Sequence, residues 1–161
     1  MAFVAIGPVQ ADTLTGKVLR VADGDTILLL TAESKRQSVR VVGIDAPEPA
    51  QPFGRDAREH LQRLLGTRDV RAECLKVQDG GSLLCKLWAH PADCASCGLT
   101  LDVGLAQVSA GMAWWNRRYA HDQSPEDQAR YETAEAEARA AKRGLWADKA
   151  PVPPWDWRHG R

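Results

Sequence analysis

The sequence lacks several features that would place a protein in a special class. It contains no apolar run of transmembrane length, no low-complexity block and no internal repeat. It also lacks a charge excess, because 21 basic residues balance 21 acidic residues. A chain that binds nucleic acid through its overall charge is usually basic. Any attraction to phosphate must therefore come from a local group of lysine or arginine side chains.

The length of 161 residues suits one domain with one hydrophobic core. We expect a signal-peptide remnant at 1–11, a folded domain at 12–147 and a tail rich in proline and tryptophan at 148–161. The first segment is apolar and ends in Val9-Gln10-Ala11, which has the small-residue pattern of a signal-peptidase site. The alternative is an apolar N-terminus without a targeting role. The first interpretation predicts an exported protein, periplasmic or secreted, whose mature form has no membrane contact.

The chain has four cysteines: Cys74, Cys85, Cys94 and Cys97. An even number of cysteines in an exported chain indicates disulfides. The Cys94-Ala-Ser-Cys97 pair lies in a predicted loop, without the strand-helix context of a redox motif. A zinc site formed by all four cysteines is the alternative.

The first part of the domain predicts three strands, at residues 14–22, 25–31 and 38–44. The Asp-Gly dipeptide at 23–24 and the polar run at 33–37 are turn signals, so these strands form an antiparallel meander. Residues 70–77 and 82–88 predict a hairpin around Gln78-Asp79-Gly80-Gly81. A symmetric turn would place Cys74 opposite Cys85, within reach of a cross-strand disulfide, with Cys94–Cys97 as a second, local bridge.

Three helices complete the predicted order. They cover residues 54–65, 101–110 and 125–143; Ser124 is the expected N-cap of the third, and Pro125 is its first residue. The tail after them is not expected to be helical and should lie over the body of the protein, anchored by its tryptophans. Five antiparallel strands with a helix between the third and fourth predict an α+β, mainly β fold, an OB-fold barrel with three helices.

Two strand ends carry carboxylates that suit a hard metal ion. Asp25 begins the second strand, and Asp45 ends the third, where Pro47 stops the ladder. Carboxylates, backbone carbonyls such as that of Ala46, and water are the ligands that Ca²⁺ prefers. Glu48 could hold or deprotonate a metal-bound water, and Arg40 could bind a phosphate oxygen. These groups together indicate metal-assisted phosphodiester hydrolysis.

With these groups at these spacings, the sequence resembles the staphylococcal nuclease (thermonuclease) family. The resemblance runs from about residue 14 to 146, and its motifs are Val21-Ala-Asp-Gly-Asp-Thr26, Arg40-x4-Asp45-Ala-Pro-Glu48, Ala106-x4-Gly111 and Gly144-Leu-Trp146. The tail sequence Pro-Pro-Trp-x-Trp-Arg, residues 153–158, resembles exported proteobacterial members. The resemblance implies Ca²⁺-dependent cleavage of DNA and RNA. It also implies Asp25, Asp45 and the Ala46 carbonyl as metal ligands, Glu48 as the base and Arg40 as a phosphate clamp.

One position departs from the family pattern. The family places a second arginine, which contacts the scissile phosphate, where this chain has Ser82. Loss of one transition-state donor typically costs about 3–4 kcal/mol, or roughly a hundred- to a thousand-fold in rate. On the symmetric hairpin Lys86 shares the face of Ser82, about 13 Å along the strand, whereas Lys76 lies on the other face. Lys86 and Arg117 are the candidate replacements.

Aromatic residues follow the second helix. Tyr119 aligns with an aromatic residue that the family uses near the substrate, and Trp114 and Trp115 should point to opposite sides of an extended segment. The preferred hypothesis is a monomeric, Ca²⁺-dependent endonuclease with DNA and RNA as substrates, slowed by Ser82. The alternative is a catalytically impaired barrel that binds nucleic acid or a protein. The intact carboxylates favour the enzyme.

Overall fold

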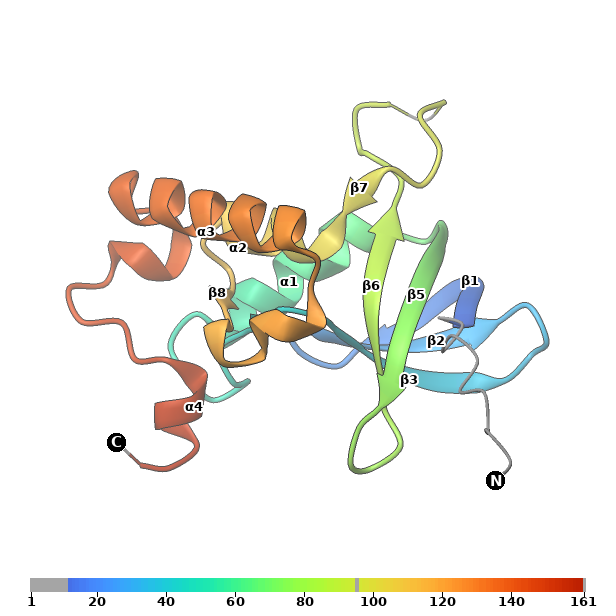
Figure 1. Cartoon of the computed structure of the whole chain (residues 1–161), viewed down its shortest axis with the longest axis horizontal. Helices are drawn as coiled ribbons and strands as arrows, with labels where there is room; N and C mark the ends of the chain where they lie inside the picture. Colours follow the sequence, from blue (N-terminus) through green and yellow to red (C-terminus); the bar gives the residue numbers. More distant parts are fainter. Residues whose placement is uncertain (1–11, 95, 161) are drawn as a thin grey trace, which may run out of the picture.

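The computed structural model describes residues 12–94 and 96–160, so the expected signal remnant at 1–11 lies outside the described residues. The expected barrel is confirmed. Five strands close on themselves in the order β3-β2-β1-β5-β6, and a parallel pairing of β3 with β6 makes the closure. The strands are β1 (Asp12–Val21), β2 (Thr26–Thr31), β3 (Arg36–Val41), β5 (Asp69–Val77) and β6 (Leu83–Ala89). Figure 1 shows the barrel to one side of the helices.

Alternating side chains fill the barrel. Ile27 and Leu29 of β2 point inward, as do Val39 and Val41 of β3, and all four are at most 1% exposed. Helix α1 (Gly54–Leu65) closes one end with Ala57, Leu61 and Leu65, and it ends before Gly66, as expected. One continuous core therefore supports the strand ends that carry Asp25, Arg40 and Asp45.

The short strand β7 (Leu101–Asp102) pairs with β6 and extends the sheet of the barrel. The remaining elements lie beside the barrel (Figure 1). They are β4 (Ile44–Asp45), α2 (Val103–Ser109), β8 (Trp114–Trp115), η1 (Arg117–Asp122), α3 (Pro125–Ala140), η2 (Gly144–Ala147) and α4 (Pro154–Trp157). Ser124 caps α3 by accepting a hydrogen bond from the Asp127 amide at 3.1 Å, as the sequence predicts. Helix α4 corrects the expectation of a non-helical tail, since Pro154 sits in its first turn, where proline is tolerated.

The expected third strand is interrupted. It ends at Val41, and Gly43 takes a φ of +78°, a conformation that glycine adopts without strain. The chain then forms β4, which pairs with β8 so that Asp45 lies opposite Trp114. Trp115 joins the main core, whereas Trp114 belongs to a second cluster with Ala138, Leu145 and Trp146. The two tryptophans thus support different cores, as their alternation in an extended segment predicts.

Both expected disulfides are present. Cys74–Cys85 links β5 to β6, and Cys94–Cys97 closes the loop between β6 and β7. No cysteine is free among the described residues, which rules out the four-cysteine zinc site. Within the same residues, no helix is both long enough and apolar enough to cross a membrane.

Candidate active site

Asp25 is held at a tight turn. Its Oδ2 accepts a hydrogen bond from the Ala46 amide at 2.8 Å, and its Oδ1 accepts one from the Thr26 hydroxyl at 2.8 Å. The turn can approach this closely because residue 24 is glycine: a Cβ there would lie 2.6 Å from the Ala46 Cβ. The Asp23-Gly24 turn therefore brings Asp25 against the chain segment that follows β4.

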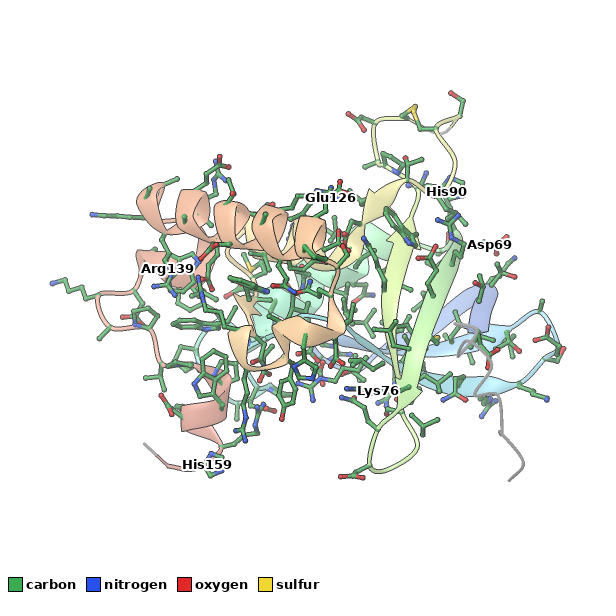
Figure 2. The ribbon with its side chains drawn as sticks, viewed as in Figure 1. Asp69, Lys76, His90, Glu126, Arg139 and His159 are labelled. Atoms are coloured by element: carbon green, nitrogen blue, oxygen red, sulfur yellow. A yellow bond between two sulfur atoms is a disulfide. The ribbon has the colours of Figure 1, made fainter. Side chains whose placement is uncertain are left out.

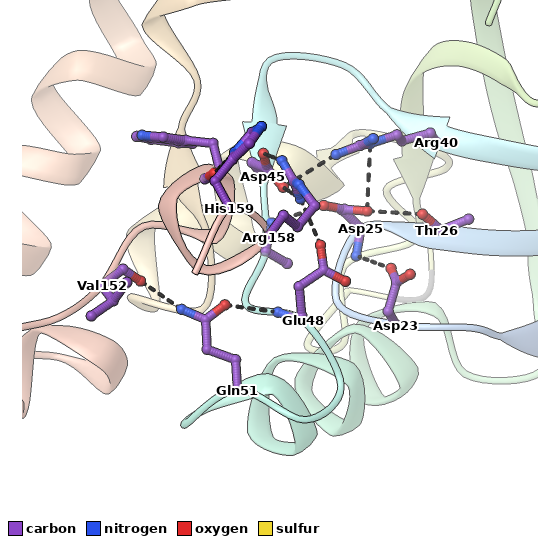
Figure 3. A network of polar contacts seen from close by, with 12 residues as sticks. Asp23, Asp25, Thr26, Arg40, Asp45, Glu48, Gln51, Val152, Arg158 and His159 are labelled. Carbon is purple, nitrogen blue, oxygen red and sulfur yellow. Dashed lines mark hydrogen bonds and ion pairs between the residues drawn. The ribbon is translucent and has the colours of Figure 1, made fainter. Parts of the chain in front are cut away.

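Arg40 and Asp45 meet Asp25 at the end of β3. The Asp45 side chain is 2% exposed and accepts a hydrogen bond from Arg40 Nη2 at 3.2 Å. Arg40 Nε lies 3.7 Å from Asp25 Oδ1. The Arg40 guanidinium thus contacts both carboxylates, as Figure 3 shows.

Glu48 lies on the loop between β4 and α1. The Gln51 side chain accepts a hydrogen bond from the Glu48 amide at 3.1 Å, and a Cβ at Gly54 would collide with the Glu48 carbonyl oxygen. The backbone of Glu48 is therefore fixed, while its side chain stays 33% exposed. One pocket of about 300 Å³ is lined by all five expected site residues: Asp25, Arg40, Asp45, Ala46 and Glu48.

Arg158, which the sequence reasoning did not select, enters the same pocket from the C-terminal tail. It follows α4 and donates two hydrogen bonds to Asp45, from Nη2 to Oδ2 at 2.7 Å and from Nη1 to Oδ1 at 3.1 Å. Its Nη1 also lies 2.6 Å from Glu48 Oε1 (Figure 3). The arginine that ends the Pro-Pro-Trp-x-Trp-Arg segment was the available signal, but nothing local in the sequence indicates where that segment docks.

Burial controls the charge of the site. It raises the pKa of Asp25 to about 7, against the opposing effect of Arg40, whose positive charge favours the ionised form. The hydrogen bond with Asp45, followed by the one with Glu48, holds the pKa of Arg158 above its usual value. A pair of desolvated carboxylates gains strongly from a nearby cation, and in this structure two guanidinium groups meet that need.

The expected faces of the β5–β6 hairpin need one correction. Cys74 does face Cys85, but a bulge at Leu75 shifts the next pair to Lys76 and Leu84. A shift of one residue moves a side chain to the other face. Lys76 therefore lies on the outward face with Leu84, not on the opposite face, and it lines a second pocket beside Arg40 and Arg158. Figure 2 shows Lys76 near the tip of this hairpin.

The two expected replacements for the missing arginine are engaged elsewhere. Lys86 lies 2.6 Å from Asp127 and 3.5 Å from Asp102, and it is absent from the described lining of both pockets. Arg117 pairs with the buried Glu135 at 2.7 Å and stacks on Trp115. Carboxylates of β7 and α3 thus neutralise both side chains.

Ser82 and Tyr119 border this region. The Ser82 hydroxyl donates a hydrogen bond to the Ser38 hydroxyl at 2.8 Å, just before the level at which Leu84 pairs with Arg40. Tyr119 is 47% exposed and lines the pocket of Lys76, together with a neighbouring pocket walled by Trp114, Trp115 and Trp155. Arg158 lines all three pockets, so it stands where they meet.

Comparison with known proteins places this sequence in a family. The family model described as "Staphylococcal nuclease homologue" matches residues 38–148, which include Arg40, Asp45 and Glu48. The chain belongs to the staphylococcal nuclease homologue family. The carboxylate pocket of this family member thus lies partly within the matched segment, and its remaining lining residues are Asp23, Asp25, Thr26 and Arg158.

Curated relatives of this staphylococcal nuclease homologue agree. An "Uncharacterized endonuclease" of Escherichia coli is 34% identical over 98% of the chain and 93% of the relative. A "Micrococcal nuclease" of Shigella flexneri is 37% identical over 94% of the chain and 83% of the relative, and a "Thermonuclease" of Staphylococcus hyicus is 30% identical over 91% and 83%. Family membership supports a hydrolytic nuclease that acts on nucleic acid.

Proposed function

We propose that the protein is a Ca²⁺-dependent endonuclease that hydrolyses phosphodiester bonds of DNA and RNA. One observation carries the proposal: two buried carboxylates, Asp25 and Asp45, share a pocket with an arginine and a partly exposed glutamate. The metal half of a phosphodiesterase and its candidate base are therefore close together on a rigid barrel.

The donor set fits a hard cation. Asp25 and Asp45 would hold the ion with the Ala46 carbonyl, and water would supply the remaining oxygens. Within the described residues no cluster of three or more His, Cys, Asp or Glu side chains has metal-site geometry. The proposed site therefore relies on two carboxylates and one backbone carbonyl, and water and substrate would supply the other ligands.

Each protein group has a distinct role in the proposed reaction. Ca²⁺ when bound would stabilise negative charge on the phosphate and favour ionisation of nearby water. Glu48, 33% exposed and held by its backbone, takes the proton of the attacking water. Arg40 donates hydrogen bonds to a phosphate oxygen as charge develops there.

The neighbouring pockets suit the rest of a nucleic-acid strand. Tyr119 and Trp155 line the larger one, which has a volume of about 430 Å³. We propose that exposed Tyr119 stacks on a base, which is a sequence-tolerant contact. Arg117 lines the same pocket but is paired with Glu135, so its part in binding is secondary.

The phosphate half of the site has lost one arginine at Ser82. A serine hydroxyl has neither the charge nor the fork of a guanidinium. Unless another cation replaces the arginine, this substitution should lower the cleavage rate roughly a hundred- to a thousand-fold relative to an enzyme that has both arginines.

Export is part of the proposal. Two disulfides are typical of chains that fold in an oxidising compartment, periplasmic or extracellular. The protein would act there as a monomer, with the segment 12–147 as its folded domain and 148–161 as its tail. Cell fractionation that finds the protein in the cytosol would contradict export.

A cleavage assay tests the function. Single-stranded DNA and RNA are incubated with the protein and Ca²⁺, and EDTA in excess should abolish cleavage. Asp25→Asn should lose activity and Ca²⁺ binding, whereas Asp79→Asn, which changes the same charge at an exposed hairpin turn, should keep both. Cleavage that survives EDTA would refute the metal, and a folded protein without cleavage would instead favour the binding module.

A further inference from the structure

The Arg158 guanidinium is a built part of the carboxylate pocket. It contacts both Asp45 oxygens and one Glu48 oxygen, and its side chain is only 40% exposed. Among the described residues that line this pocket, the cationic side chains are Arg40 and Arg158. The two arginines approach Asp45 from different parts of the chain, one from the barrel and one from the tail (Figure 3).

Several independent contacts hold the tail in this position. The Gln51 side-chain nitrogen Nε2 donates a hydrogen bond to the Val152 carbonyl at 2.6 Å. The side-chain oxygen Oε1 of the same residue accepts one from the Glu48 backbone amide. Trp155 packs edge-on against Trp114 with ring centroids 5.7 Å apart. Gln51 thus joins the tail directly to the loop that carries Glu48, and the tryptophan pair joins it to β8.

We propose that Arg158 is the second phosphate-binding arginine of this enzyme. The C-terminal tail supplies it in place of the arginine that the family carries at the position of Ser82. The inference rests on the proposed nuclease function. When the carboxylates hold a cation, the Arg158 fork is free to turn to a phosphodiester in the same pocket. Its planar donors match two phosphate oxygens as well as they match the two oxygens of Asp45.

The charges of the pocket support this role. Its lining includes four carboxylates (Asp23, Asp25, Asp45 and Glu48) against two guanidinium groups. With a divalent cation the formal sum is neutral. Without Arg158 the sum would be −1, and a negatively charged phosphodiester would meet repulsion in a partly dehydrated pocket. Arg158 thus completes the charge that the substrate requires.

Three other cations near the pocket are paired with carboxylates outside it. Lys76 is bound by Asp122 at 2.7 Å, Lys86 by Asp127 and Arg117 by the buried Glu135. The partners of Arg158, by contrast, are Asp45 and Glu48 themselves, one of which is proposed to bind the metal and the other to activate water. Binding of metal and substrate therefore releases Arg158 where its charge is needed.

The test compares Arg158→Ala with Lys149→Ala, which removes the same charge from an exposed position of the tail. We expect kcat on single-stranded DNA to fall about 100- to 1,000-fold in Arg158→Ala and to stay unchanged in Lys149→Ala. Circular dichroism and thermal melting of each variant verify folding. A fall of less than tenfold, or a rise in rate that would mark the tail as inhibitory, overturns the proposal.

A second readout does not depend on catalysis. Without substrate, Ca²⁺ must displace the Arg158 guanidinium from Asp45, so calorimetry should show tighter Ca²⁺ binding to Arg158→Ala than to the wild type. Equal affinities would mean that the guanidinium does not reach the carboxylates, and this result also overturns the proposal. Failure of the nuclease function itself is distinguishable, because the wild type would then show no EDTA-sensitive cleavage in the same assay.

Discussion

Removal of the buried disulfide should destabilise the barrel strongly. Cys74 and Cys85 are 5% and 0% exposed, and Cys85 pairs both with Cys74 on β5 and with Val41 on β3. The bridge therefore sits at the seam where the barrel closes, directly behind the strand that carries Arg40. The perturbation is the double variant Cys74→Ala with Cys85→Ala.

The size of the effect follows from loop length and burial. The bridge spans a sequence separation of 11, for which the chain-entropy relation gives about 3 kcal/mol. Removal of two buried sulfur atoms adds roughly 1–2 kcal/mol for lost transfer energy and cavity formation. The total loss is about 4–5 kcal/mol, which corresponds to a fall in Tm of roughly 10–15 °C for a chain of this size.

Denaturant titration and calorimetry measure this loss, with Cys94→Ala plus Cys97→Ala as the matched control. That bridge spans a separation of only 3, and Cys97 is exposed, so its removal should cost about 2 kcal/mol or less. The reasoning is refuted if both double variants lose the same free energy of unfolding, or if the first loses less than about 1 kcal/mol. Either result would mean that the Cys74–Cys85 bridge does not stabilise the closure of the barrel.

Two further substitutions test the core and the proposed base. Tyr131→Phe removes a 2.7 Å hydrogen bond to the buried Asp102 and should cost about 1.5–3 kcal/mol by urea unfolding. Burial and Asp102 raise the pKa of Tyr131 in the folded state. Its contribution to the free energy of unfolding is therefore fully present below about pH 10, the pKa in the unfolded chain, and is lost as the pH rises further. If the difference in unfolding free energy between wild type and Tyr131→Phe stays unchanged above pH 10, this reasoning is refuted. Glu48→Gln should lower kcat about a hundredfold or more while Ca²⁺ still binds, and a rate within tenfold of wild type would exclude Glu48 as the base.

Turn and strand signals in the sequence were sufficient to predict the parts of the site that lie close together in the meander of β1, β2 and β3. The Asp-Gly turn fixes where β2 begins, and Pro47 with Gly43 fixes where β3 and β4 end. Since β2 and β3 are adjacent antiparallel strands that pair Thr26 with Arg40, Asp25 had to lie close to Arg40. Asp45 follows only after the turn at Gly43, on β4. Cys74 and Cys85 were predictable for the same reason, because one turn sets the pairing of both strands.

Two features near the site escaped sequence reasoning because of one irregular residue and one long-range contact. The bulge at Leu75 has no distinct sequence signature, yet it carries Lys76 to the opposite face of β5. Arg158 lies more than a hundred residues from Asp45 along the chain, and the contact depends on how Trp155 packs against Trp114. Neither hydrophobic periodicity nor turn chemistry constrains a tail that docks through tertiary contacts.

The two arginines of the proposed site are held by structures of different strength. Arg40 belongs to a strand paired on both sides inside the closed barrel, so its placement is lost only when the barrel itself unfolds. Arg158 follows a single turn of helix, and it stays in place through Gln51, a tryptophan pair and its own ion pairs. Undocking of the tail breaks only those contacts, at much lower cost than global unfolding. The proposed metal ligands and Arg40 therefore depend on the stability of the barrel, whereas the proposed phosphate contact of Arg158 depends on the tail. We expect catalysis to fail on warming while the fold and the proposed Ca²⁺ ligands remain intact.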